Sequence, residues 1–377
     1  MTDAEPIKTG QAAPAEEHVY VASQWQLMWW RFRKHKLALV SGAVIILYFA
    51  VALFCEFFAT EDPLFQQAMY AFAPPQALHF IREGRPQLYV FGFSNKRDPV
   101  TLQMLYTVDK NKVYPLRLFV HGHPYKALGL FPTDIHLLGF ADPKAGVRLT
   151  LLGTDRMGRD MWSRLMYGTR ISMSIGLVGV ALSLTLGIVL GGISGFYGGA
   201  VDMAIQRAIE FIRSIPTIPL WMSLAAAMPR DWPPLRVYFG ITIILSLIGW
   251  TGMARVVRGR FLSLREEDFV MAARLSGSGE MRIILVHMVP SFLSHIIASV
   301  TLAIPGMILS ETSLSFLGLG LRPPVISWGV LLQEAQNIRS VALAPWLLLP
   351  GVAVIIAVLS YNFLGDGLRD AADPYGR

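Results

Sequence analysis

The apolar residues of this chain are gathered into six long runs, separated by polar or proline-rich segments. Each run approaches the roughly 20 residues that an α-helix needs to cross the hydrocarbon core of a bilayer. The runs cover about 37–59, 171–196, 205–228, 237–255, 291–312 and 344–364. The pattern predicts an all-α polytopic membrane protein with six transmembrane helices.

The third run differs from the others in its charge and proline content. Arg207, Glu210 and Arg213 lie in its first turns, and Pro216 and Pro219 lie near its middle. Charged side chains favour the membrane surface, and a proline removes a backbone donor and bends a helix. We therefore expect this helix to begin at the membrane surface and to be kinked in its middle.

The segment between the first two runs, residues 60–170, has a different organisation. Short runs with strand-like composition (QLYVFGF, TLQMLYTV and YPLRLFV) alternate there with turns that contain proline. This alternation predicts strands, and hence an extracytoplasmic α+β insertion between the first and second transmembrane helices. At its end, residues 158–168 carry apolar positions at helical spacing beside Arg159 and Arg164. That spacing suggests an amphipathic helix on the outer membrane surface.

Composition and charge support a membrane protein and set its orientation. Hydrophobic residues make up 53% of the chain and charged residues 16%, with a formal net charge of +7. A basic excess suits either nucleic acid or cytoplasmic membrane loops; in so apolar a chain we expect a lipid bilayer and no nucleic acid. Basic residues cluster before the first run and in the loop 264–290, which places this loop and both termini in the cytoplasm.

These predictions divide the chain into five parts. They are a cytoplasmic tail (1–36), the first transmembrane helix (37–59), the insertion (60–170), a core of five transmembrane helices (171–365) and a cytoplasmic tail (366–377). The core contains the loop 264–290, which is too polar and too interrupted to cross the membrane.

The loop 264–290 predicts two short helices joined by a glycine turn. Asp268 is placed to cap the first helix, and Gly277 is placed to end it. A second short helix is expected at about 280–288, and Pro290 then suits the first turn of the fifth transmembrane helix. Phe269, Val270 and Leu275 would present apolar side chains on the first helix. They suit either a groove on a partner protein or packing on the same subunit, and the residues alone leave both open.

The chain lacks the motifs of common catalytic and nucleotide-binding sites. It has no G-x-x-x-x-G-K-[ST] phosphate loop, no H-E-x-x-H and no G-x-S-x-G. His121 and His123 alone are too few ligands to predict a metal site. We therefore expect a non-catalytic chain that binds no cofactor and no metal.

The loop resembles the E-A-A-x3-G-x9-I-x-L-P segment of bacterial ATP-binding-cassette (ABC) importer permeases. Ala272, Ala273, Gly277 and Pro290 match this motif in register. The chain departs from it at three positions, where Met271, His287 and Val289 replace glutamate, isoleucine and leucine. In that family the segment is a coupling helix that docks on the ATPase subunit.

Other stretches resemble the second, C-type permease of dipeptide, oligopeptide and nickel importers. They are LLGTDRMGRDMWSRLMYGTRISMSIGL, RSIPTIPLWMSLA, SETSLSFLGLGLRPPVISWGVLL and FLGDGLRDAADPYGR. The resemblance implies a type I importer fold in the bacterial cytoplasmic membrane. It implies three kinds of partner: a second permease in a heterodimer, two ATP-binding subunits that hold ATP and Mg, and an extracytoplasmic solute-binding protein.

The resemblance also implies roles for individual residues. The ATPase-coupling loop would comprise Asp268, Phe269, Met271, Ala272, Ala273, Arg274, Leu275, Gly277, His287 and Pro290. Candidates for the translocation path are Ser310, Glu311 and Thr312, because an ionisable residue in a transmembrane helix commonly marks a path. Candidates for contact with the binding protein are Asp155, Arg159, Asp160, Pro323 and Trp328. A peptide is the expected solute. An oligosaccharide or nickel remains an alternative solute for the same importer architecture. A further alternative is a self-sufficient secondary transporter or channel.

Overall fold

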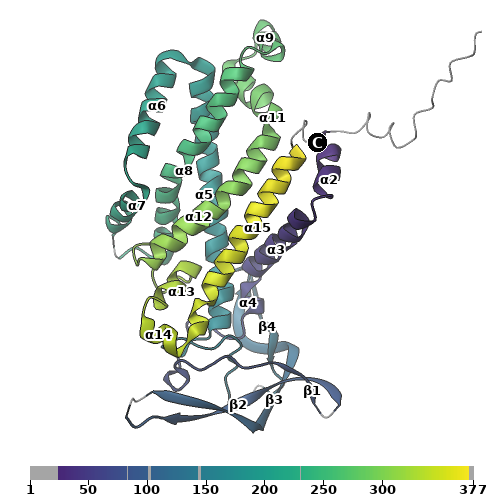
Figure 1. The fold of residues 1–377 in the computed structure, drawn as a ribbon, viewed down its shortest axis with the longest axis vertical. Coiled ribbons are helices and arrows are strands. Elements are labelled where there is room, and N and C mark those ends of the chain that lie inside the picture. The colour runs from purple at the N-terminus through teal and green to yellow at the C-terminus, as the bar shows by residue number, and fades with distance from the viewer. Residues whose placement is uncertain (1–23, 83, 101–102, 143–145, 230, 373–377) are drawn as a thin grey trace, which may run out of the picture.

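The structure is a computed structural model, and it describes residues 24–82, 84–100, 103–142, 146–229 and 231–372. It consists of a bundle of long helices with a β-sheet at one end (Figure 1). Most of the predicted N-terminal tail, and the last residues of the predicted C-terminal tail, lie outside the described residues.

Five helices in the described part of the chain are long and apolar enough to cross a membrane. They are α3 (Lys36–Leu53), α5 (Met161–Tyr197), α8 (Pro234–Leu264), α12 (Leu293–Phe316) and α15 (Leu349–Ala372, which continues the short helix η3, Pro345–Leu348). They correspond to the first, second, fourth, fifth and sixth predicted transmembrane helices. Shorter helices connect or extend them: α2 (Gln24–Phe32), α4 (Cys55–Phe58), η1 (Ala68–Tyr70), α13 (Trp328–Glu334) and α14 (Ile338–Leu343).

The third predicted transmembrane helix consists of two shorter helices. They are α6 (Gly199–Ser214) and α7 (Thr217–Ala226), and neither is long enough to cross a bilayer alone. The chain is extended at Ile215, because the ring of Pro216 disfavours a helical conformation of the preceding residue. The predicted kink is therefore confirmed, and it is a complete break.

Helix α5 begins ten residues before the predicted start of the second transmembrane helix. Asp160 is its N-cap, and the side chain of Asp160 accepts a hydrogen bond from the backbone N–H of Ser163. No turn separates residues 161–168 from the apolar run that follows, so the prediction of a separate surface helix at 158–168 is wrong. With 37 residues, α5 is about 55 Å long and extends past the bilayer.

Glycines on α5 allow α8 to approach its backbone closely. A Cβ atom added at Gly191 would lie 2.8 Å from the Cα atom of Ala254, and one at Gly195 would lie 2.8 Å from the carbonyl oxygen of Arg258. Small residues at such contacts are a main source of helix association in lipid. Gly191 and Gly195 are therefore packing positions.

The described residues contain one four-stranded antiparallel sheet in the order β1-β2-β3-β4. Its strands are β1 (His79–Arg82), β2 (Arg85–Arg97), β3 (Met104–Ala127) and β4 (Phe131–Phe140). The predicted run QLYVFGF lies in β2, and the runs TLQMLYTV and YPLRLFV, predicted as separate strands, both contribute to β3. Val90 and Leu116 pack with Leu149 in a small apolar core between the sheet and the chain that leads into α5. The sheet lies at one end of the bundle, and α2 and the end of α15 lie at the other (Figure 1).

The close contact of α5 with α8 predicts opposite effects for two glycine substitutions. In Gly191→Ala the new methyl group meets the backbone of Ala254, and we expect a loss of about 1–3 kcal/mol of stability. Gly252 of α8 is the matched control, because a Cβ atom there meets nothing within 4 Å. Gly252→Ala should be neutral or stabilising, since alanine is the better helix former by about 1 kcal/mol. Thermal unfolding of both variants in detergent checks this; equal effects would contradict it.

Candidate functional site

The loop 264–290 forms a short helix at the end of the bundle opposite the sheet. This helix, α9 (Asp268–Leu275), follows the end of α8 and projects beyond the long helices (Figure 1). It lies at the same end of the bundle as α2 and the end of α15 (Figure 1). The prediction that Asp268 caps the helix is wrong, because Glu267 occupies the N-cap position and no side chain caps it.

One face of α9 is buried against the same chain. Val270 is fully buried and Ala273 nearly so, and both belong to an apolar cluster with Phe261 of α8. The cluster also includes Ile283 and Ile284, from the turn of helix that follows α9. These contacts fix α9 on the ends of the long helices, which is one of the two alternatives that the sequence left open.

The opposite face of α9 is apolar and exposed. Phe269 and Met271 are exposed, and Leu275 has 87% of its surface free. Ala272 and Arg274 are exposed on the same helix. The helix therefore has an inward face that packs on its own subunit and an outward face with Met271 and Leu275, four residues apart; Phe269 is exposed at the flank of the inward face.

Two polar contacts join the α9 region to the end of α5. The guanidinium of Arg274 lies over the ring of Phe196, 5.0 Å from its centroid, which is a cation–π geometry. The hydroxyl of Tyr197 donates a hydrogen bond to the carboxylate of Glu280. Gly277 ends α9 with a φ of +76°, a conformation that glycine adopts without strain, so its predicted role is confirmed.

The second predicted helix of the loop is present but irregular. It comprises α10 (Glu280–Arg282), a π-helical turn η2 (Ile283–Met288) and α11 (Val289–Ser291). His287 lies half-buried in η2, and Pro290 is exposed in α11, just before α12 begins at Leu293. Pro290 therefore occupies the connection to the fifth transmembrane helix and not its first turn.

An ion pair joins α6 to α8 beside this region. Both carboxylate oxygens of Asp202 accept hydrogen bonds from Arg258, each at 2.5 Å. The sequence did not indicate this pair, because 56 residues separate its members. The pair links the first half of the broken third helix to the end of α8 that leads into α9.

At the sheet end of the bundle, Asp155 and Arg159 form a buried ionic cluster. The Asp155 carboxylate accepts from Nε of Arg159 at 2.6 Å and from Arg164. Glu334 of α13 accepts from Nη2 of Arg159 at 2.6 Å and from Nη1 of Arg164 at 3.3 Å. Two carboxylates thus face two guanidinium groups and tie the start of α5 to α13. The sequence did not indicate Arg164 or Glu334 for this cluster, because burial depends on the distant partner.

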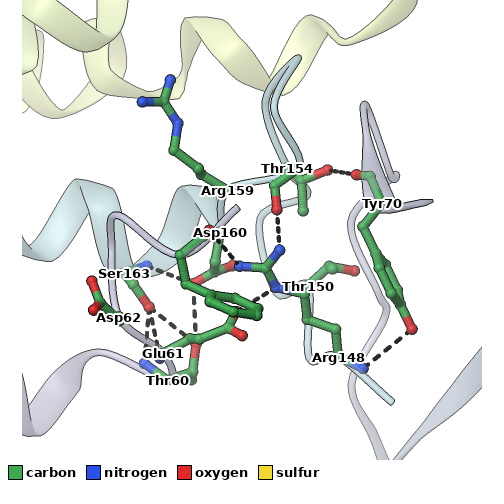
Figure 2. Close-up of polar contacts among 12 residues, drawn as sticks. Thr60, Glu61, Asp62, Tyr70, Arg148, Thr150, Thr154, Arg159, Asp160 and Ser163 are labelled. Atoms are coloured by element: carbon green, nitrogen blue, oxygen red, sulfur yellow. Dashed lines mark hydrogen bonds and ion pairs between the residues drawn. The ribbon is translucent and has the colours of Figure 1, made fainter. Parts of the chain in front are cut away.

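A second polar cluster surrounds Asp160 (Figure 2). The Asp160 carboxylate accepts from the backbone N–H of Ser163 at 2.7 Å and from the Thr60 hydroxyl at 3.1 Å. The Ser163 hydroxyl in turn accepts from the backbone N–H groups of Thr60 and Glu61, each at 3.0 Å. Arg148 donates to the Glu61 carboxylate. These contacts attach the chain after α4 to the start of α5.

The structure contradicts most of the predicted contacts with a binding protein. Asp155, Arg159, Asp160 and Trp328 are buried, so their side chains are not available to a docking protein. In Figure 2 the Arg159 side chain points away from the Asp160 cluster, toward the C-terminal half of the chain. Pro323 is exposed, and its contact with a binding protein stays a prediction.

Two of the three predicted residues of the translocation path are also buried. Glu311 is fully enclosed; its carboxylate accepts from the hydroxyls of Ser315 at 2.8 Å, Ser327 at 2.7 Å and Ser172 at 3.3 Å. Thr312 is buried beside it, while Ser310 is half-exposed. Glu311 therefore joins α5, α12 and α13 inside the subunit. The prediction that it lines a path is wrong for this conformation, and Ser310 stays a candidate.

His121 and His123, the two histidines that the sequence brings close together, have different partners in the structure. His121 pairs with Asp134, with 3.0 Å between Nδ1 and a carboxylate oxygen. The ring of His123 lies tilted against the ring of His136, with 4.4 Å between the centroids. Within the described ranges, no three histidine, cysteine or acidic side chains are close enough together to hold an ion.

Burial changes the titration of the cluster around Asp160. Burial raises the pKa of the Glu61 carboxyl to about 7, an effect that the Arg148 guanidinium only partly offsets. Burial also raises the pKa of Asp160, one of whose carboxylate oxygens has no hydrogen-bond partner. Near neutral pH the Glu61 carboxyl is therefore partly protonated.

The raised pKa of Glu61 predicts a pH-dependent stability. From about pH 4.5 to about 7 the folded chain holds a proton on Glu61 that the unfolded chain has released, so the free energy of unfolding falls as pH rises. We expect this contribution to reach at most about 3 kcal/mol and to be absent in Glu61→Gln, whose amide oxygen still accepts from Arg148. Thermal unfolding of both proteins at about pH 5 and about pH 8 checks the prediction. Equal losses in the two would contradict it.

Comparison with known proteins places the chain in a family. Residues 187–375 match the model of the binding-protein-dependent transport system inner membrane component. Residues 23–75 match the model of the N-terminal transmembrane domain of oligopeptide transport permease C. The two matches together include the loop 264–290 and the first transmembrane helix.

Individual relatives agree with these matches. The oligopeptide transport system permease protein OppC of Haemophilus influenzae is 38% identical over 246 residues, which are 65% of this chain and 76% of that protein. A putative peptide permease protein of Brucella suis is 36% identical over 262 residues, which are 69% of this chain and 81% of that protein. The dipeptide transport system permease protein DppC of Alkalihalophilus pseudofirmus is 39% identical over 224 residues, 59% of this chain and 71% of that protein.

A solved structure of the MetNI methionine ABC transporter in an inward-facing conformation shows a weaker likeness. It has 18% identity and a TM-score of 0.45, and the match covers 56% of this chain and 98% of that chain. The family assignment depends instead on the length of the family match and on the identity of the relatives. This chain belongs to the family of binding-protein-dependent transport system inner membrane components, as a C-type permease subunit of an ABC importer.

Proposed function

We propose that this permease carries a peptide across the bacterial cytoplasmic membrane, driven by ATP hydrolysis on partner subunits. The observation that carries the coupling to partner subunits is the exposed apolar surface of α9, with Met271 and Leu275 on its outward face and Phe269 at the flank, on a helix that is fixed to the bundle. A water-exposed apolar helix face fits a groove on another protein. In this family that partner is the ATPase.

The mechanical role of the loop follows from its contacts. A force on α9 passes through Val270 and Ala273 to the cluster around Phe261 of α8. It also passes through Arg274 to Phe196 at the end of α5. Because packed helices move as rigid bodies, ATP-driven closure of two ATPase subunits would rock α5 and α8 together. This chain would take no catalytic part; ATP and Mg would bind to the partners.

The proposed assembly includes two further partners. A second permease would form a heterodimer with this chain and complete the path, with Ser310 as the remaining candidate lining residue. An extracytoplasmic binding protein would deliver the solute at the sheet end, near Pro323. In this orientation α9 and both chain termini lie in the cytoplasm, as the basic residues around them favour.

The coupling role predicts a specific loss of ATPase binding. Leu275→Asp places a charge on the exposed α9 face, and we expect the affinity for the ATPase to fall about tenfold or more, because one buried leucine contributes about 1.5–3 kcal/mol. Ile338→Asp is the matched control: Ile338 is 86% exposed and Leu275 is 87% exposed, but Ile338 lies in α14 at the opposite end. Binding kinetics of the purified permease pair with the ATPase measure the difference. Equal affinities of the two variants would contradict a docking role for α9.

The solute class is tested by uptake into proteoliposomes that contain the complete importer and enclose ATP. We expect uptake of a labelled oligopeptide and none of an oligosaccharide or of nickel under the same conditions. Uptake of the oligosaccharide or of nickel alone would replace peptide as the solute. Uptake by this chain without ATP and without the ATPase would instead indicate a secondary transporter or channel.

A further inference from the structure

The turn between β3 and β4 carries large apolar side chains where a water-exposed turn usually carries polar ones. Leu128 and Phe131 are exposed, and Leu130 has 73% of its surface free. The turn closes its own backbone hydrogen bonds: the N–H of Gly129 donates to Lys126 at 2.9 Å, and the N–H of Leu130 donates to Ala127 at 3.0 Å. Leu128 adopts a φ of +54°, a conformation that favours asparagine or glycine. The turn is therefore well formed, but its composition does not suit water.

The tip of this hairpin lies beside membrane-spanning helices. Leu128 and Gly129 line a groove of about 730 Å³ whose other walls come from α3, α4 and α5. Phe49 and Leu53 of α3 and Leu177 of α5 line the same groove. These three residues belong to helices that are long and apolar enough to cross the bilayer. The hairpin thus returns from the sheet toward the level of the membrane.

His136 fixes the direction of the hairpin. Its Nδ1 atom lies 3.0 Å from the carbonyl oxygen of Glu56 and 2.8 Å from that of Ala59, at the end of α4. Its Nε2 atom lies 3.0 Å from the carbonyl oxygen of His123 on the paired strand. From this attachment β4 runs about 17 Å to Phe131, where the turn joins it, because each strand residue advances about 3.3 Å. The hairpin is thus held at its base, and its tip lies beside α3, α4 and α5.

Polar and aromatic residues lie between the attachment and the tip. Tyr125 donates from its hydroxyl to the carbonyl oxygen of Ile135 at 2.6 Å, and Lys126 follows it at the start of the turn. Tyrosine and lysine are typical of the headgroup region, with leucine and phenylalanine on the hydrocarbon side. The order along the hairpin matches this gradient from polar to apolar.

We infer that the β3–β4 hairpin is a membrane anchor. Its tip, residues 126–131, inserts Leu128, Leu130 and Phe131 into the edge of the hydrocarbon, in the leaflet on the sheet side of the bilayer. The inserted tip continues the lipid-facing surface of α3, where Ile46 and Leu47 are exposed apolar residues. Lys126 and Tyr125 then lie among the headgroups. The sheet is held against the membrane by this anchor as well as by its contacts with the protein.

The test measures membrane depth at single spin labels in the complete importer, reconstituted in phosphatidylcholine nanodiscs. Leu130→Cys carries the test label, Ile46→Cys marks the lipid-facing surface, and Val100→Cys marks water. Val100 is 88% exposed in the chain that joins β2 to β3. Cys55 is buried, and labelling of the parent chain measures its background. Partner subunits without cysteine keep the signal specific.

Oxygen is enriched in hydrocarbon and a nickel chelate is enriched in water, so the two relaxants report depth. We expect the label at position 130 to collide more often with oxygen than with the chelate, as at position 46, and the reverse at position 100. A label at position 130 that behaves as at position 100 would place the tip in water and overturn the inference. A label shielded from both relaxants would overturn it as well, since another protein subunit would then cover the tip.

Discussion

The close approach of α5 and α8 is the contact on which the other parts of the structure depend. Gly191 and Gly195 leave no room for a side chain between the two backbones, so the helices cannot separate or slide without losing this packing. Because α5 spans 37 residues without a break, its two ends are mechanically connected. The N-terminal end of α5 begins at its N-cap Asp160, in the polar clusters at the sheet end of the bundle. The other end, at Phe196 and Tyr197, contacts the α9 region.

This connection explains why so many charged groups are buried at the start of α5. In the proposed coupling mechanism α5 transmits movement, and such a helix must be attached at both ends. Asp155 and Arg159 join Glu334 of α13 through short hydrogen bonds, and Glu311 joins three helices through serine hydroxyls. Buried charges are costly unless they are paired, so such clusters permit few alternative arrangements. The charges that the sequence suggested for a docking surface or a path therefore serve as internal attachments.

The difference between successful and failed predictions lies in the range of the interactions. The transmembrane helices, the strands and α9 were predictable because apolar periodicity, proline and glycine act over a few residues. Even the break at Pro216 was indicated locally. The burial of Arg159 depends on Glu334, 175 residues away, and the burial of Glu311 depends on Ser172, 139 residues away. A single sequence contains no pattern that pairs such positions, and a charged residue without a known partner is expected at a surface.

The sheet shows the converse case, in which apolar residues are exposed although a sequence alone would place them in a core. Three large apolar side chains at the β3–β4 turn look like core residues in a sequence, yet the fold leaves them exposed beside α3. The sheet has only a small core of its own around Val90, Leu116 and Leu149. Its position therefore depends on attachments at its margin: His136 at the end of α4, the polar contacts of Arg148, and the tip in the bilayer. Arg148 lies on the chain that leads into α5, and Glu56 of α4 pairs with Arg170 of α5, so an inserted tip would oppose movement of α5 relative to the membrane. Movement driven from α9 would then be taken up within the helical bundle.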